Sequence, residues 1–598
     1  FDDHFVFDHT KDRMGLRKLP HATTKVKKGA VGRGRAALSP GALRDLDARW
    51  AKLVWPELGV ETYPDLLDLV HARLHHDTRP STSSGTSSRS SDSSSSSSVH
   101  RSLGVFAPTT QQTTTTAAAK RDDAATDEAL VVEAAMQWAK VRALDPYSRS
   151  LGGGGGNKAA VGKLACTITP QGLGGEAATA LFRDAVAPTL RSNGHPLNLA
   201  FVASAPTAAA IACDWMVSAA CQNGPFASAC PGLIDAERLA VRWLADLAGF
   251  PPEARGTFVS GATLGTLSAL HAARQKHLRH RQSQRADAPT TSSLKSSSRI
   301  VTSGDAHSSV HLAAKVLAVD LVVIDEDDWA QSVEEMLERD AAANNEIFAI
   351  VATAGSTNSG RVDDLARLGR LCRSTEHVWL HVDGAYGLGA LASASKRVIF
   401  KGLDLADSFV VDPHKMLFAP YDSCALVYRN GTDARLAHAQ HAAYLDALTC
   451  EQDDVYNPSE FAIHLSRRPR GAALWFSLAV YGTDKYQADI DAIFACAATV
   501  ANFIQEAEYL DLVEKPTLPI ILFQKRGGMS REAKLQWCQT TWEASELFCQ
   551  PTTYRSESVF RLCFVNPATS PHAVITVLKS LAAAAVVGGG GGDDGSTE

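Results

Sequence analysis

A lysine that follows an apolar run and a Pro-His turn is the residue of this 598-residue chain with the clearest chemical potential. The run covers residues 408–411, Asp-Pro-His follows it, and the lysine is Lys415. A lysine amine held at the end of a buried strand can form a Schiff base with a carbonyl group. The tetrapeptide 412–415 alone is a weak signal, because a lysine after a strand is most often an ordinary surface residue. The segments upstream of it therefore decide how it is interpreted.

Three such segments precede Lys415 in the chain. The apolar run 378–382 ends at Asp383, the run 300–302 leads to His307, and a Gly/Ser/Thr-rich turn at 256–266 comes before a helical pattern. Apolar runs that end in polar residues are typical of buried parallel strands, whose carboxyl ends meet at one crevice. A turn that feeds a helix binds anions, because free N–H groups and the helix dipole point at them.

The order phosphate turn, histidine, aspartate, lysine resembles that of the group II amino-acid decarboxylases, which use pyridoxal phosphate. This family includes the aromatic-amino-acid and glutamate decarboxylases. The resemblance runs from about residue 195 to 581. The segments that carry it further are 195–237, the strand and turn at 351–363, the Arg-Arg and Trp signature at 466–482, and a closing strand at 560–567.

The resemblance implies an α/β fold of fold type I. Its central sheet is mostly parallel and covered by helices on both faces, and the alternation of apolar runs and helical patterns over 207–485 favours the same architecture. An N-terminal helical segment and a small α+β C-terminal domain complete it. The predicted parts are a flexible region 1–124, the helical segment 125–206, the large domain 207–485, the small domain 486–585 and a tail 586–598.

Two residues are expected to do the central chemistry. By the resemblance, Lys415 holds pyridoxal phosphate as a Schiff base, and the cofactor ring accepts the electrons that a departing carboxylate leaves behind. That role needs a protonated ring nitrogen. Asp383 is the residue type that keeps this proton in place, since a carboxylate stabilises a pyridinium in a site of low dielectric.

The other cofactor contacts also follow from the resemblance. His307 stacks on the cofactor ring, and Ala385 packs against the opposite face, where a larger side chain would collide. Ala262 and Thr263 bind the phosphate, with Ser260 and Thr266 as neighbours. Thr353 and His414 complete the expected cofactor-binding set.

The family returns a proton to the substrate carbon with a tyrosine on a loop ahead of the Arg-Arg signature. Tyr456 is the candidate here, although counting back from Arg467 places the expected tyrosine nearer Pro458. The offset matters because relatives without that tyrosine convert amino acids oxidatively to aldehydes. Asp412 is another departure, since better-known members have asparagine there, and its role is left open.

These residues also fit other interpretations. His307 and His311 have the spacing of two metal ligands on one helix face, but no glutamate follows the first histidine and no third ligand stands nearby. Asp383 could cap a strand end, His307 could be a core histidine, and Tyr456 could anchor its loop. A cofactor-binding scaffold without activity and an aldehyde synthase are the alternative functions.

The substrate is predicted less directly. Phe201 and Phe226 lie near the positions that line the family's substrate pocket, which favours an aromatic amino acid, although core packing explains them equally well. The nearby residues that differ from the aromatic and proline residues of the aromatic-acid enzymes are Leu197, Asn198, Leu199 and Ala203.

Composition and charge favour a soluble enzyme. The net charge is −6 and no basic patch stands out, so no nucleic-acid partner is expected. No run approaches the ~20 apolar residues of a membrane span. The 11 cysteines are scattered, without a Cys-x-x-Cys pair, as expected in a reducing compartment. Phe1 indicates that the true start is missing or processed, and cytoplasm is the default location.

Low-complexity tracts are predicted to be flexible and to carry no chemistry. They cover 81–98, 109–119, 152–156, 283–298 and 588–598. A short amphipathic piece at 40–74 has no assigned role, and 128–141 has the periodicity of a helix. By the resemblance, such N-terminal helices clasp a partner subunit, so a homodimer with active sites at its interface is expected.

Overall fold

The computed structural model describes residues 117–145, 151, 162–202, 205–283, 298–342, 346–375, 377–440 and 455–583. The predicted tracts 81–98, 152–156 and 588–598 and the amphipathic piece 40–74 lie outside these residues. Ala203 and the loop residues 449–454 ahead of Tyr456 also lie outside them.

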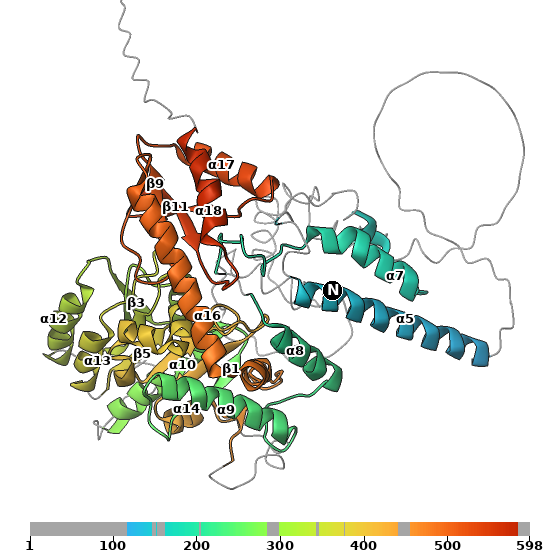
Figure 1. The fold of residues 1–598 in the computed structure, drawn as a ribbon. Helices are drawn as coiled ribbons and strands as arrows, with labels where there is room; N and C mark the ends of the chain where they lie inside the picture. Colours follow the sequence, from blue (N-terminus) through green and yellow to red (C-terminus); the bar gives the residue numbers. More distant parts are fainter. Residues whose placement is uncertain are drawn as a thin grey trace, which may run out of the picture. The chain divides into compact units, whose positions relative to one another are not determined.

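The large domain is built on a seven-stranded sheet with the strand order β1-β7-β6-β5-β4-β2-β3. Figure 1 labels β1, β5 and β3 of this sheet. Its strands are β1 (Arg255–Val259), β2 (Arg299–Ser303), β3 (Asp320–Ile324), β4 (Ile347–Thr353), β5 (Trp379–Asp383), β6 (Ser408–Val411) and β7 (Cys424–Tyr428). The pairs from β6 through β5, β4 and β2 to β3 are parallel, whereas β7 runs antiparallel to both β1 and β6. The predicted α/β fold with a mostly parallel sheet is confirmed.

Alternate residues of each central strand enter two different hydrophobic cores. In β5, Leu380 and Val382 belong to one core and Trp379 to the other. In β6, Phe409 and Val411 face the first core and Val410 faces the second. Both faces are therefore buried, which explains why these strands are continuous apolar runs in the sequence.

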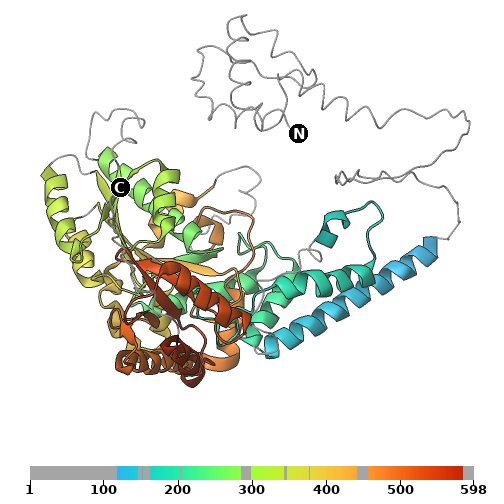
Figure 2. The same ribbon diagram turned by 90° about the horizontal axis from the view of Figure 1, so that it is seen from above.

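Helices cover both faces of the sheet (Figure 2). The core that contains Trp379 also contains residues of α10 (Ala262–Ser283), α11 (Ser308–Leu317) and α14 (Gly431–His438). The other core contains residues of α9 (Pro231–Leu247), α12 (Trp329–Ala342), α13 (Leu365–Arg373) and α16 (Ala472–Glu506). Short helical turns lie at Gly387–Ala392, Ala394–Phe400, Leu403–Leu405 and Pro458–Glu460.

Helix α16 connects the two domains. Gly482 has φ 75° and ψ 164°, which interrupts the helix, and glycine adopts this backbone conformation readily. Among the described helices, α16 alone is long and apolar enough to cross a membrane. Its buried residues Tyr486, Ile490 and Ile493 pack in the core, so it serves here as a core helix. The boundary predicted between residues 485 and 486 falls inside it.

The small domain is a four-stranded antiparallel sheet with the order β10-β11-β9-β8. Its elements are β8 (Leu510–Leu512), β9 (Ile520–Lys525), β10 (Gln550–Tyr554), β11 (Glu557–Cys563), α17 (Arg531–Glu543), α18 (Pro571–Leu578) and a helical turn at Lys579–Ala582. Phe523 and Phe560 stack across β9 and β11 with ring centroids 5.0 Å apart. These residues belong to the same core as Leu380, so the small domain packs directly against the large one.

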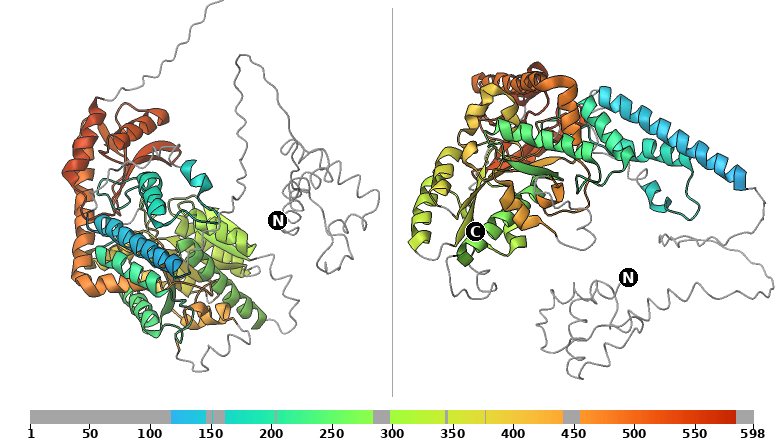
Figure 3. Two further views of the ribbon diagram at one scale, coloured as in Figure 1. Left: turned by 90° about the vertical axis from the view of Figure 1, so that its right-hand side faces the viewer. Right: turned by 90° about the horizontal axis from the view of Figure 1, so that it is seen from below.

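The N-terminal part contains α5 (Ala117–Leu144), α7 (Gly175–Leu181) and α8 (Ala208–Ala220), with helical turns at Lys163–Cys166, Phe182–Val186 and Ala187–Thr189. Helix α5 is longer than the predicted 128–141 and begins inside the tract 109–119 that was expected to be flexible. It lies beside α7 (Figure 3), where the Asp127 carboxylate accepts the Gly175 N–H at 2.9 Å. Trp138 meets Phe182 edge to face, with centroids 5.4 Å apart.

Candidate active site

The candidate active site lies at the carboxyl ends of β4, β5 and β6. Thr353 ends β4 and is the ladder neighbour of Asp383, which ends β5. Asp383 is in turn paired with Val410 of β6, and the turn after β6 carries Lys415. Three residues that lie about thirty positions apart in the sequence are thus brought to one edge of the sheet, as the order of the apolar runs predicted.

Asp383 is a buried carboxylate with a cationic neighbour. Its Oδ1 accepts the N–H of Ala385 at 3.2 Å. Burial raises the pKa of Asp383, and the positive charge of Lys415 opposes that rise. A cationic ring nitrogen placed here would stabilise the ionised carboxylate in the same way.

Lys415 is held by a second carboxylate. Its Nζ lies 3.0 Å from Oδ2 of Asp412, and Nε2 of His414 lies 3.4 Å from the same oxygen. Burial lowers the pKa of Lys415, but Asp412 and Asp383 outweigh it, so the pKa is raised. Burial likewise raises the pKa of Asp412, yet Lys415 and His414 bring it down to about 2.

The predicted phosphate turn joins β1 to α10. The strand ends at Val259, Ser260 and Gly261 form the turn, and the helix starts at Ala262. The first N–H groups of a helix have no acceptor within it, so those of Ala262 and Thr263 are available to an anion. A Cβ added at Gly261 would meet nothing within 4 Å, so there is open space in front of this helix end.

His381 connects this turn to the strands that carry the other site residues. Its Nδ1 lies 2.8 Å from Oγ of Ser408 and its Nε2 lies 3.2 Å from Oγ1 of Thr266. Ser408 also accepts the indole N–H of Trp379 at 2.8 Å. Burial lowers the pKa of His381 to about 3, so the ring is neutral. It links β5, β6 and α10.

The sequence interpretation missed His381, although a signal was present. Residues i and i+2 of a strand point to the same face. His381 precedes Asp383 by two positions and therefore points to the same face of β5. A polar residue two positions before a predicted catalytic aspartate is a reason to look for a supporting contact.

His307 lies at the start of α11, beyond the end of β2. Its Nδ1 accepts the N–H of Ser309 at 3.2 Å and thereby caps the helix. Its ring is exposed, and its charge is among those that lower the pKa of Asp383. Within the described ranges, no three His, Cys, Asp or Glu side chains are grouped to hold a metal ion, so the pairing of His307 with His311 gains no support as a metal site.

Tyr456 is not brought to Lys415 within this chain. Its hydroxyl donates to the carbonyl of Gly256, near the start of β1, and its ring stacks on Phe461 with centroids 5.4 Å apart. The phosphate turn lies at the other end of β1. The catalytic role of Tyr456 therefore remains a prediction. Its hydrogen bond to Gly256 is the kind of contact that anchors a loop.

The tyrosine that does lie near Lys415 is Tyr421. Its ring centroid is 4.4 Å from that of His414, and the residue is 54% exposed, whereas Asp383, Asp412 and His414 are buried. The charge of Lys415 acts on its hydroxyl, although burial is the larger effect and raises the pKa of Tyr421. The sequence interpretation did not single it out.

The residues of segment 195–237 are partly structural. Leu199 is buried and pairs its backbone with Phe548 and Cys563 of the small domain. Phe226 is also buried, whereas Phe201 is exposed and stacks with Arg191 at 5.5 Å. Of the two phenylalanines, only Phe201 is exposed.

Several buried polar atoms at this edge of the sheet have no hydrogen-bond partner. They are Oγ1 of Thr353, Oγ of Ser303 at the end of β2, and Oδ1 of Asp412. Buried polar groups are normally paired, so unpaired ones at a strand edge are suited to a polar ligand. The lysine, the aspartate and the open helix end also match the aldehyde, ring nitrogen and phosphate of pyridoxal phosphate. The residues present therefore fit this cofactor.

Comparison with known proteins agrees with this chemistry. The family model described as the pyridoxal-dependent decarboxylase conserved domain matches residues 177–526, more than half of the chain. An aromatic-L-amino-acid decarboxylase of Bacillus atrophaeus is 28% identical over 400 residues, which cover 65% of this chain and 80% of that protein. An L-2,4-diaminobutyrate decarboxylase of Rhizobium meliloti (strain 1021) is 28% identical over 406 residues, which cover 65% of this chain and 77% of that protein.

Solved structures share the fold. Oryza sativa TDC with PLP and tryptamine has a TM-score of 0.67 and 20% identity, covering 79% of this chain and 99% of that one. Rhodiola rosea 4-hydroxyphenylacetaldehyde synthase has a TM-score of 0.65 and 19% identity, covering 77% of this chain and 97% of that one. The chain belongs to the pyridoxal-dependent decarboxylase family. It is a carboxy-lyase that uses pyridoxal phosphate, as the sequence predicted.

Proposed function

We propose that this chain decarboxylates an aromatic L-amino acid to the corresponding amine and carbon dioxide, with Lys415 as the cofactor lysine. The observation that carries the proposal is the meeting of Lys415, Asp383 and Thr353 at one edge of the parallel sheet. Bound pyridoxal phosphate supplies an electron-withdrawing ring that stabilises the charge left on the substrate carbon.

The chain's own residues orient and polarise that group. Asp383 holds a proton on the ring nitrogen, and the open end of α10 receives the phosphate. His307 stands at the start of α11, where its ring is free to cover the cofactor. His381 fixes the spacing between the phosphate turn and the strand ends, because it bonds to Thr266 and to Ser408.

An aromatic substrate is supported by three observations. The similar protein of Bacillus atrophaeus is an aromatic-L-amino-acid decarboxylase, and the Oryza sativa structure contains tryptamine. Tyr421, with its half-exposed ring against His414, offers an aromatic surface close to Lys415. The similarity to an L-2,4-diaminobutyrate decarboxylase keeps basic amino acids in the test panel.

An aldehyde synthase is the second candidate function. Tyr456 is engaged with Gly256 in this chain, and one structure of similar fold is an aldehyde synthase. Such an enzyme releases carbon dioxide together with ammonia and consumes oxygen to give hydrogen peroxide. The two functions are therefore separated by their second products.

The experiment is a panel of aromatic, acidic and basic L-amino acids incubated with the cofactor-loaded protein. Carbon dioxide and peroxide are measured in parallel. Carbon dioxide from aromatic substrates without peroxide supports the proposal. Stoichiometric peroxide would assign the chain to the aldehyde synthases, and turnover restricted to basic or acidic substrates would contradict the aromatic assignment.

The proposed working form is a homodimer in the cytoplasm. Helix α5 exposes apolar side chains that a partner subunit would cover, namely Val132, Met136, Val141 and Leu144. The cysteines that the structure describes are free thiols, which suits a reducing compartment. Light scattering of the purified protein checks the dimer, and a monomer at micromolar concentration would contradict it.

A further inference from the structure

Asp412 is a buried carboxylate that, among the residues the structure describes, contacts Lys415 and His414, the two residues that follow the Pro of its own turn. It is 3% exposed, and its Oδ2 contacts both Nζ of Lys415 and Nε2 of His414, at 3.0 and 3.4 Å. Its Oδ1 is buried and has no hydrogen-bond partner. A buried carboxylate is strongly destabilised when its cationic partner is removed. Asp412 therefore favours the state in which Lys415 carries a positive charge.

Other groups around Lys415 do not replace this contact. The groups that face Lys415 come from its own loop and from three strands. They are Asp412, His414, Tyr421, Asp383 of β5, Cys424 of β7 and Cys563 of β11. His307 faces Asp383. Asp383 is the second carboxylate, and it is expected to be occupied by the cofactor ring nitrogen. Asp412 then remains as the anion that holds the lysine.

We propose that Asp412 is a positioning residue that holds Lys415 as an ammonium group after the amine of the substrate has displaced it from the cofactor. The same contact weakens cofactor loading, because Lys415 must be uncharged to bond with the cofactor aldehyde. The inference rests on the proposed role of Lys415 as the cofactor lysine.

The exchange is balanced in atoms and charge. The bond between Nζ of Lys415 and the cofactor's aldehyde carbon breaks, and the substrate nitrogen forms a bond to the same carbon. The substrate arrives as an ammonium ion with three N–H protons and gives up two of them. Lys415, which held one proton in the protonated linkage, takes up these two and leaves as an ammonium ion. No oxidant or reductant is needed.

The consequence is a displacement equilibrium that depends on residue 412. With aspartate there, the released ammonium group returns to the contact at 3.0 Å and has three N–H donors, whereas the protonated linkage has one, so displacement is favoured. With asparagine of the same shape, the released ammonium loses that partner. Loading then becomes easier and displacement becomes harder.

The test compares the wild type with Asp412→Asn by absorbance titration, using pyridoxal phosphate for loading and methylamine as the displacing amine. Asp412→Asn is expected to bind the cofactor about fivefold more tightly. The pH midpoint at which the absorbance band of the lysine–cofactor linkage forms should be about one unit lower in this variant. Its displacement by methylamine is expected to be about tenfold weaker. Asp404→Asn, an exposed aspartate on the turn Leu403–Leu405, is the control and should match the wild type.

The inference would be overturned if the wild type and Asp412→Asn had the same cofactor affinity, the same pH midpoint of the lysine–cofactor band and the same displacement by methylamine. Lys415→Ala separates this failure from a failure of the site assignment. It should give no lysine–cofactor band, and a band that persists in it would show that Lys415 is not the cofactor lysine. Asp412→Ser removes the same charge and carries the test if Asp412→Asn does not fold.

Discussion

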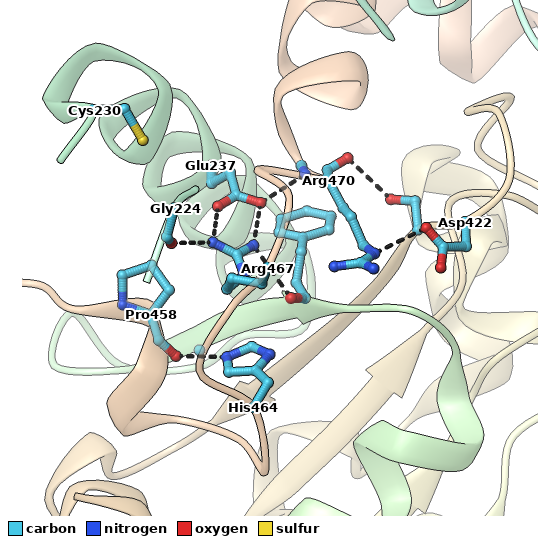
Figure 4. A network of polar contacts seen from close by, with 12 residues as sticks. Gly224, Cys230, Glu237, Asp422, Pro458, His464, Arg467 and Arg470 are labelled. Atoms are coloured by element: carbon cyan, nitrogen blue, oxygen red, sulfur yellow. Dashed lines mark hydrogen bonds and ion pairs between the residues drawn. The ribbon is translucent and has the colours of Figure 1, made fainter. Parts of the chain in front are cut away.

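Arg467 and Glu237 form an enclosed bidentate ion pair, with Nη2 to Oε1 and Nη1 to Oε2 distances of 2.6 and 2.7 Å (Figure 4). The pair joins α9 to the loop ahead of α16. The carbonyls of Gly224 and Phe258 accept further bonds from the guanidinium, and the N–H of Gly471 donates to Oε1 of Glu237 at 2.8 Å. Each charge therefore has several partners within the protein.

Removing one charge of this pair should destabilise the fold. Glu237→Ala leaves the guanidinium buried without its anion and is expected to lower the free energy of unfolding by about 3–5 kcal/mol. Urea unfolding measures it. Asp235→Ala on the same helix removes an exposed ion pair with Arg238 and should cost less than about 1 kcal/mol. Equal losses in the two variants would contradict the structural role of the buried pair.

Replacing Asp383 should remove catalysis while the fold is kept. Asp383→Asn has nearly the same shape, but it cannot hold a proton on the cofactor ring by its charge. Carbon dioxide release is expected to fall by at least about a hundredfold, as when one electrostatic stabiliser of a transition state is removed. Steady-state kinetics with the best substrate of the panel and circular dichroism check it. A variant that folds and retains wild-type turnover would refute the role of Asp383.

Tyr421 should affect substrate affinity through its ring. Tyr421→Ala removes the aromatic surface on His414 and is expected to raise KM for an aromatic amino acid by about tenfold, whereas Tyr421→Phe keeps the ring and should change KM little. The KM and kcat of both variants are compared with the wild type. A larger effect in Tyr421→Phe than in Tyr421→Ala would mean that the hydroxyl, and not the ring, acts.

Stability should fall in acid because buried histidines resist protonation. Burial lowers the pKa of His277, His381 and His438 to about 3 each and that of His464 to about 4. Between these values and about 6.5 the unfolded chain binds more protons than the folded one. The histidines' full contribution is therefore present above about pH 6.5, and it is lost as the pH falls toward 3, by up to about 1.4 kcal/mol per pH unit for each histidine.

His277→Phe tests this dependence, because it puts an uncharged ring at a fully buried site beside Phe348. The slope of unfolding free energy against pH between 4 and 6 should become shallower in this variant. His311→Gln changes an exposed histidine and should keep the wild-type slope. An unchanged slope in His277→Phe would exclude His277 as a contributor.

The parts of the site that follow from local patterns were predictable from the sequence. Asp383, Thr353 and Lys415 each end or follow an apolar run, and parallel strands bring such ends together without further information. The contact of Asp412 with Lys415 depends on the shape of the turn after β6, which no periodicity encodes. The role of Asp412 therefore does not follow from the sequence alone.

Other features depend on long-range packing. Tyr456 bonds to Gly256, 200 positions earlier, so its distance from Lys415 could not be inferred by counting from Arg467. His381 was missed because its partners Thr266 and Ser408 come from two other elements. The small domain was predicted from the resemblance, whereas its shared core with the large domain became visible only in the structure.

Trapping the cofactor on its lysine tests the central claim most directly. The protein loaded with pyridoxal phosphate is reduced with sodium borohydride, digested and mapped by mass spectrometry. We expect the pyridoxyl group on Lys415, in a peptide that contains the strand 408–411. A label on a different lysine, or carbon dioxide release from a preparation in which Lys415 stays unlabelled, would contradict the account.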